Sequence, residues 1–71
     1  MTHRFKIGQP VYFSPASRMQ SAARGVYTVT GLLPDNIDGQ PEYRIKHHAE
    51  GYERAAQEGE LSPVYFKLYG W

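Results

Sequence analysis

The 71-residue sequence contains no cysteine. This absence excludes disulfides, thiolate metal ligands and a cysteine nucleophile together. Small secreted domains usually depend on disulfides, so a chain of this size without cysteine is expected in the cytoplasm. A long apolar run is also lacking: residues 1–10 show no signal-peptide pattern, and no segment approaches the length of a membrane span. We therefore expect a cytoplasmic protein that does not enter a membrane.

An excess of one charge is missing as well. Eight Lys and Arg residues stand against seven Asp and Glu, which leaves a formal net charge of +1. Dedicated nucleic-acid-binding domains usually carry a strong basic excess, so only a local basic patch could serve that function here. Apolar residues make up 41% of the chain, which is enough for a packed core and argues against disorder. At this length the chain is expected to form one domain over residues 1–71.

What the sequence does contain is a series of short alternating segments separated by Gly and Pro. Alternation predicts five strands, over residues 10–14, 25–33, 42–48, 52–56 and 62–69. Tyr27, Val29 and Leu33 are expected on one face of the second strand, with a bend or bulge at Gly31. A long loop is expected over residues 14–24, and one short 3₁₀ or helical turn over residues 57–61, before the last strand. This order predicts an all-β fold, a small five-stranded SH3-like barrel in which residues 64–71 supply the last strand and an aromatic C-terminal tail.

Three phrases carry a resemblance to a known group of proteins: EYRIK at residues 42–46, EGYER at 50–54 and GELSP at 59–63. Together with FKIGQPVYFSP and GVYTVTGLLP, they make residues 5–63 similar to a group of small alphaproteobacterial proteins of unknown function with SH3-like folds. The layout also resembles KOW and Tudor-type barrels. The resemblance implies the barrel fold and carries no activity. The near-neutral charge departs from the nucleic-acid-binding KOW pattern.

The residue patterns of catalysis and metal binding are missing. His47 and His48 are adjacent, and on a strand their side chains would point to opposite faces, so we do not expect them to share one metal ion. Glu58 and Glu60 flank Gly59 in a turn that is expected to be solvated, with no buried pocket to raise a carboxyl pKa. There is no G-x-S-x-G serine motif and no glycine-rich phosphate loop. We expect no enzymatic activity, no cofactor and no bound metal.

A basic strand face is one candidate binding surface. Arg44, Lys46 and His48 alternate along residues 42–48, and Arg54 on the following strand is expected nearby. Cations beside aromatic rings can hold RNA or DNA through phosphates and stacked bases. Outward strand positions are commonly charged in any protein, and neighbouring acidic residues would neutralise much of this stripe. Weak nucleic-acid binding is therefore an alternative function.

The aromatic C-terminal tail is the other candidate. Tyr65, Tyr69 and Trp71 are expected to point outward, and Tyr and Trp are favoured at protein interfaces. We expect a non-catalytic interaction module that binds a protein partner or a second copy of itself through this strand and the loop at residues 14–24. By analogy with the peptide grooves of SH3-like folds, further candidates are Tyr12, Tyr27 and Tyr52. A small accessory subunit of a larger enzyme is a second alternative.

Overall fold

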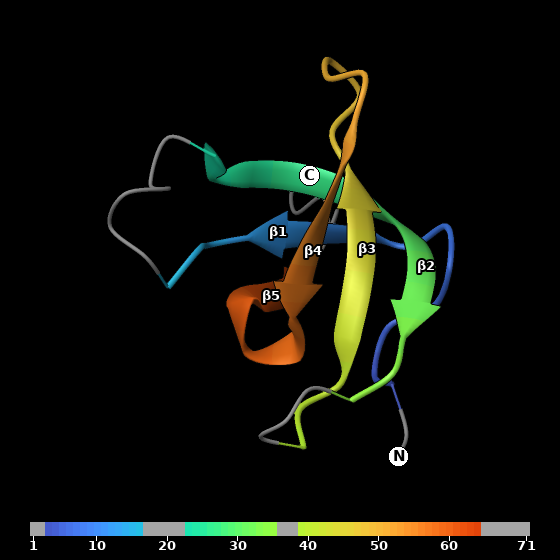
Figure 1. The fold of residues 1–71 in the computed structure, drawn as a ribbon. Coiled ribbons are helices and arrows are strands. Elements are labelled where there is room, and N and C mark those ends of the chain that lie inside the picture. The colour runs from blue at the N-terminus through green and yellow to red at the C-terminus, as the bar shows by residue number, and fades with distance from the viewer. Residues whose placement is uncertain (1–2, 17–22, 36–38, 65–71) are drawn as a thin grey trace, which may run out of the picture.

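The structure, a computed structural model, describes residues 3–16, 23–35 and 39–64. Five strands and one 3₁₀ turn follow one another in these residues: β1 (Pro10–Phe13), β2 (Gly25–Leu33), β3 (Glu42–Lys46), β4 (Glu53–Gln57), the turn η2 (Glu58–Glu60) and β5 (Leu61–Pro63). All neighbouring strands are antiparallel, and they form one sheet in the order β4-β3-β2-β1-β5 (Figure 1). The prediction of an all-β fold with five strands and a short 3₁₀ turn before the last one is confirmed.

The sheet curves into a barrel-like shape, and the long strand β2 makes the curve. Its first half pairs with β1, and it pairs with β3 from Thr28 to its end (Figure 1). The two edge strands, β4 and β5, are not paired with each other in the described part of the chain. The turn η2 joins them directly in sequence. The SH3-like barrel is therefore open along this edge.

A bulge in β2 changes which of its residues face the core. The register with β3 shifts between Val29 and Gly31, so the bend predicted at this glycine is confirmed. Beyond the shift, Leu32 lies opposite the core residue Tyr43. Directly opposite residues share a face of a sheet, so the register places Leu32 on the side of Tyr43, although Leu32 is 44% exposed and does not add to the core. The prediction that Leu33 shares a face with Val29 is wrong, because one extra residue inverts the alternation.

The core is small and draws on every strand. Its buried apolar side chains alternate with exposed ones along β1 and β3 and along the first half of β2, as the sequence pattern predicted. Full burial of each large apolar side chain contributes about 1.5–3 kcal/mol. The N-terminal segment before β1 adds one ring to the core. The buried residues are Phe5, Val11, Phe13, Tyr27, Val29, Tyr43, Ile45, Ala56 and Leu61.

Several strand ends differ from the prediction by one or two residues. β3 ends at Lys46 and not at residue 48, because the backbone N–H of Glu50 donates to the carbonyl of His47 at 3.0 Å and closes a turn. β4 begins at Glu53, one residue later than expected. β5 covers Leu61–Pro63, and the remainder of the predicted last strand and tail, residues 65–71, lies outside the described residues. Among the residues that are described, no helix has the length and apolar character needed to cross a membrane.

Candidate interaction surface

The hairpin between β3 and β4 projects beyond the rest of the barrel (Figure 1). Its turn is held from within: besides the bond to the His47 carbonyl, the N–H of Ala49 donates to His47 Nδ1 at 3.0 Å. The His47 ring packs edge-on against Tyr27, with the ring centroids 5.2 Å apart. This contact fixes the base of the hairpin against β2, so side chains on the hairpin start from a defined position.

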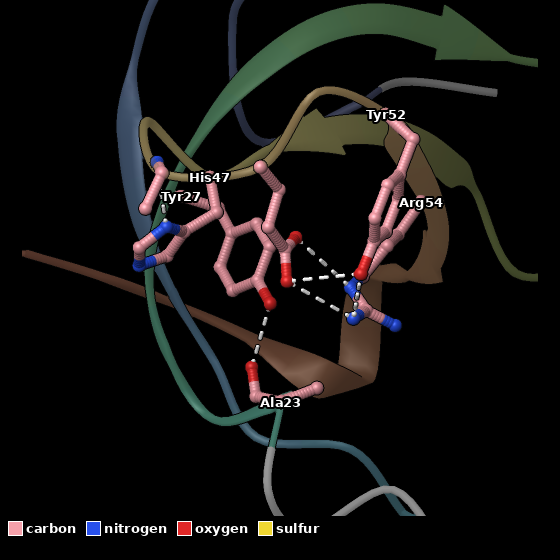
Figure 2. A network of polar contacts seen from close by, with 7 residues as sticks. Ala23, Tyr27, His47, Tyr52 and Arg54 are labelled. Atoms are coloured by element: carbon pink, nitrogen blue, oxygen red, sulfur yellow. Dashed lines mark hydrogen bonds and ion pairs between the residues drawn. The ribbon is translucent and has the colours of Figure 1, made fainter.

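Glu50, Tyr52 and Arg54 form a connected group on this hairpin, which we call the Tyr52–Arg54 platform (Figure 2). Arg54 Nε lies 3.4 Å from Glu50 Oε1, and Arg54 Nη2 lies 3.2 Å from Glu50 Oε2. The Tyr52 hydroxyl donates to Glu50 Oε2 at 3.2 Å and accepts from Arg54 Nη2 at 3.1 Å. The guanidinium carbon of Arg54 is 5.3 Å from the centre of the Tyr52 ring. Each of the three side chains therefore contacts the other two.

The platform has an exposed ring between two partly buried charged side chains. Tyr52 keeps 55% of its surface accessible to solvent. The hydrogen bonds from Arg54 hold the pKa of the Glu50 carboxyl below its ordinary value, and the same bonds raise the pKa of Arg54. Both side chains are therefore charged at neutral pH, and a two-point contact between guanidinium and carboxylate restricts both. The exposed Tyr52 ring is therefore held by contacts with both charged side chains.

Behind the platform, Tyr27 anchors the end of the loop at residues 14–24. Its hydroxyl donates to the carbonyl of Ala23 at 2.7 Å (Figure 2). Tyr27 is only 2% exposed, so its ring is part of the core and is not available to a ligand. Tyr12 lies on the other face of the sheet, directly opposite Val26. The predicted groove of Tyr12, Tyr27 and Tyr52 is therefore wrong: of the three rings, only Tyr52 lies exposed on the hairpin.

The basic strand face is less basic than predicted. Arg44 Nε lies 3.4 Å from Glu53 Oε1, and Lys46 lies directly opposite Glu53 in the strand register. Arg54 lies opposite Ile45, a core residue, and so belongs to the other face of the sheet. The prediction that Arg54 joins Arg44 and Lys46 is wrong, because neighbouring positions along a strand alternate between faces. The cations Arg44 and Lys46 therefore share the outer face with the carboxylates of Glu42 and Glu53.

His47 and His48 also differ from the prediction. The strand ends before them, so their side chains do not point to opposite faces: their rings stack, with centroids 4.5 Å apart and planes inclined by 23°. His48 lies in the turn and does not extend the row of Arg44 and Lys46 along β3. Over residues 3–16, 23–35 and 39–64, no three His, Cys, Asp or Glu side chains are grouped so that they could hold a metal ion.

Glu58 is a structural anchor. Its Oε2 accepts a hydrogen bond of 2.5 Å from the Tyr43 hydroxyl and one of 2.8 Å from the backbone N–H of Arg4. The Tyr43 hydroxyl in turn accepts from the N–H of Phe5 at 3.2 Å. Burial acts to raise the pKa of Glu58, but the hydrogen bonds from Tyr43 and Arg4 outweigh it and leave this pKa lowered. The carboxylate thus joins η2 to β3 and to the N-terminal segment.

Glu60 has a similar structural role at the start of the loop. Its Oε1 accepts from the N–H of Gln57 at 3.0 Å, and its Oε2 accepts from the N–H of Ala16 at 3.0 Å. Both oxygens of Glu60, like one oxygen of Glu58, are therefore bonded to backbone donors. The expectation of a freely solvated turn is wrong, because these two carboxylates hold neighbouring segments in place.

Sequence reasoning missed that Glu50 binds Arg54 and that Glu58 binds Tyr43. A signal for the first was present, since the phrase EGYER places an acid, an aromatic residue and a base at every second position. Residues two apart in an extended chain point to the same side. The second contact joins residues 15 positions apart, and no local pattern indicates it. Of the residues predicted to bind partners, Tyr65, Tyr69 and Trp71 lie outside the described residues.

The described part of the chain contains no pocket for a small molecule. No protein-family model matches this sequence, and neither a curated protein nor a solved structure matches it.

Proposed function

We propose that this chain is a non-catalytic interaction module that binds a protein partner through the Tyr52–Arg54 platform. The observation that carries the proposal is an exposed tyrosine ring held by two polar neighbours, with a guanidinium against its face. Tyr and Arg are enriched among the residues that dominate protein-binding energies. Because the ring is already ordered, a partner that packs on it loses little conformational entropy.

The charges around the platform favour a protein over a nucleic acid. Arg54 is paired with Glu50 and Arg44 with Glu53, so neither guanidinium is left without a carboxylate. A phosphate backbone would have to compete with these carboxylates. Mixed charges around an exposed ring are instead typical of the rim of a protein interface. Weak RNA or DNA binding through Arg44 and Lys46 is the alternative outcome of the experiment below.

This proposal keeps a protein partner, as the sequence suggested, but assigns the contact to the β3–β4 hairpin. The platform lies beside Tyr27, whose hydroxyl donates to the carbonyl of Ala23 (Figure 2). A cytoplasmic location and the resemblance to small alphaproteobacterial barrels are parts of the same proposal, and a role as an accessory subunit of a larger enzyme is an alternative to it. Each is consistent with a small module that acts through a partner.

The test compares two exposed tyrosines. Tagged wild-type chain, Tyr52→Ala and the matched control Tyr12→Ala are used to recover proteins from extracts of the source cells, with and without nuclease. Tyr12 is 40% exposed and lies on the other face of the sheet, so it controls for loss of an exposed ring. Loss of a dominant contact costs about 2 kcal/mol, so the affinity of the purified partner should fall about 30-fold for Tyr52→Ala.

Two results would contradict the proposal. If Tyr52→Ala and Tyr12→Ala retain the partner equally well, the platform is not the contact. If the recovered material disappears with nuclease, and binding of a mixed single-stranded oligonucleotide falls steeply with salt, nucleic-acid binding replaces the proposal. Circular dichroism of each variant confirms that the fold is retained.

A further inference from the structure

The two edge strands of the sheet differ in how their outer backbone groups are used. In an antiparallel pair, alternate residues direct both N–H and C=O to the neighbouring strand, and the residues between them direct these groups away. On the β5 side, the N–H of Ser14 donates to the carbonyl of Glu60 at 2.9 Å. By alternation Ser62 faces β1, and Leu61 and Pro63 face outward. The N–H of Leu61 donates to the carbonyl of Glu58, and Pro63 has no N–H, so β5 presents no free donor.

On β4, by contrast, some outward-facing N–H groups are not occupied. The N–H of Glu58 donates to the carbonyl of Pro41 at 3.0 Å, so by alternation Ala56 and Arg54 face β3. Gln57, Ala55 and Glu53 then face outward.

Of these three outward-facing residues, only Gln57 has its donor occupied, through its N–H bond to Glu60 Oε1. Within the described residues, the backbone groups of Glu53 and Ala55 make no hydrogen bond beyond the strand pair. Within residues 3–16, 23–35 and 39–64, no further strand pairs with this edge of β4.

Little in the sequence of β4 protects this edge. Natural edge strands usually carry charged side chains, proline or a bulge, or are very short, and of these devices β4 has the charged residues Glu53 and Arg54. β4 has five residues in continuous register with β3, and it contains neither Pro, Gly nor Lys. At its centre Ala55 is small and exposed, so a second strand can approach closely. β5, by comparison, has three residues and ends at Pro63.

We propose that β4 pairs with β4 of a second copy of this chain, antiparallel and about a two-fold axis at Ala55. This register places Ala55 opposite Ala55 of the partner subunit, Glu53 opposite Gln57 of the partner subunit, and Arg54 opposite Ala56 of the partner subunit. No like charges are opposed in this register. The register centred on Arg54 would instead oppose two cations, which destabilises a strand pair.

The dimer would join the two sheets into one continuous sheet. Each Tyr52 lies three residues from the axis, so the two rings would be about 20 Å apart along the strand direction. Two platforms on one dimer could bind a partner with two sites, or two partners. The inference does not depend on the proposed function: the dimer contact uses backbone groups of β4 and the proposed partner contact uses the Tyr52 ring, although Arg54 belongs to both regions.

The experiment removes one outward-facing N–H of β4 and leaves the hydrogen bonds between β3 and β4 in place. Ala55→Pro deletes the donor at the axis and places the proline ring in the path of a second strand, whereas the control Ala55→Val keeps the donor. Molar mass is measured by sedimentation over a wide range of protein concentration. Wild type and Ala55→Val should rise from the mass of one chain to twice that value, and Ala55→Pro should stay at one chain. NMR spectra verify that Ala55→Pro is folded.

Hydrogen exchange of the unmodified chain gives a second readout. The amides of Glu53 and Ala55 should exchange slower by about tenfold or more at high than at low concentration. The amides of Arg54 and Ala56, which face β3, should be protected at every concentration. A wild-type chain that stays at single-chain mass overturns the proposal. An Ala55→Pro variant that still doubles in mass would also overturn it. So would an Ala55 amide whose exchange rate does not change with protein concentration. Tyr52→Ala should leave the dimer intact, which separates this test from that of the proposed function.

Discussion

The molecule contains two tyrosine–glutamate hydrogen bonds in very different surroundings. Tyr43 is fully buried at 0% exposure and donates to Glu58 at 2.5 Å, whereas Tyr52 is 55% exposed and donates to Glu50 at 3.2 Å. The chemical groups are the same. Around Tyr43 the protein replaces water as the hydrogen-bonding partner, and around Tyr52 water remains available. The comparison teaches that burial, and not the pair of side chains, decides whether such a contact stabilises the fold or forms a surface.

The buried pair is part of a larger set of contacts. The Tyr43 hydroxyl also accepts from Phe5, and the Tyr43 ring packs edge-on against His3, with centroids 4.9 Å apart. His3 Nε2 lies 2.8 Å from the Leu33 carbonyl oxygen and 3.1 Å from that of Glu42. The N-terminal segment is thus fastened to the ends of β2 and β3. The exposed pair joins residues within a single hairpin, so its loss affects one local surface.

The largest expected effect is on the buried pair. Tyr43→Phe leaves the buried N–H of Phe5 without an acceptor and Glu58 without one donor. An unsatisfied buried polar group costs about 1–3 kcal/mol, so the free energy of unfolding should fall by that amount. Tyr52→Phe should change it by less than about 0.5 kcal/mol, because water replaces the lost hydroxyl contacts. Urea unfolding of both variants measures the difference, and equal losses would contradict the comparison.

A smaller effect on the free energy of unfolding is expected from pH, with one decrease at acid pH and another at alkaline pH. The pKa of Glu58 is lowered, so its contribution to stability is present above its ordinary value and is lost as pH falls through the folded pKa. The pKa of Tyr43 is raised, chiefly by burial and then by the bond to Glu58, so its contribution is present below pH 10.0 and is lost as pH rises through the folded pKa. Urea unfolding as a function of pH should show both declines.

Tyr43→Phe provides the control for this pH profile. This substitution removes the phenol, so the fall in the free energy of unfolding at alkaline pH should become shallower. The contact between Glu50 and Arg54 is not altered by it. A profile that is identical in wild type and Tyr43→Phe would show that the buried pair is not the source of the pH dependence.

The smallest effect is expected at the platform. Arg54→Lys keeps the charge but loses the two-point contact with Glu50 and the guanidinium against the Tyr52 ring. An exposed ion pair contributes about 0–1 kcal/mol, so the stability should hardly change. The Tyr52 ring should become more mobile, which NMR relaxation of its ring carbons measures. An unchanged ring would mean that Arg54 does not order the platform.

Much of the fold could be predicted because it depends on local alternation. The positions of β1 and β2, the bend at Gly31 and the turn η2 follow from residues close together in sequence. The predicted placement of Leu33 failed because a single extra residue in β2 inverts every position after it. That of Arg54 failed because the strand register, and not the distance along the chain, decides which residues share a face.

The candidate site was harder to predict than the fold. The sequence indicated the basic residues and the tyrosines, but not that Glu50 and Glu53 would pair with Arg54 and Arg44. Pairing depends on side-chain distances of a few ångströms, and a sequence pattern does not specify these. Charges counted along a strand therefore overestimated how basic its surface is.

By itself, the sequence determined the all-β class, the number and order of the strands and the absence of thiol chemistry, because composition and period-two alternation act locally. Only the tertiary structure decided which tyrosine is buried and which is exposed, which arginines are neutralised and which edge of the sheet is open. These properties depend on contacts between residues far apart in the chain and on the direction of backbone N–H groups in a particular register. Burial and register arise only when the strands come together.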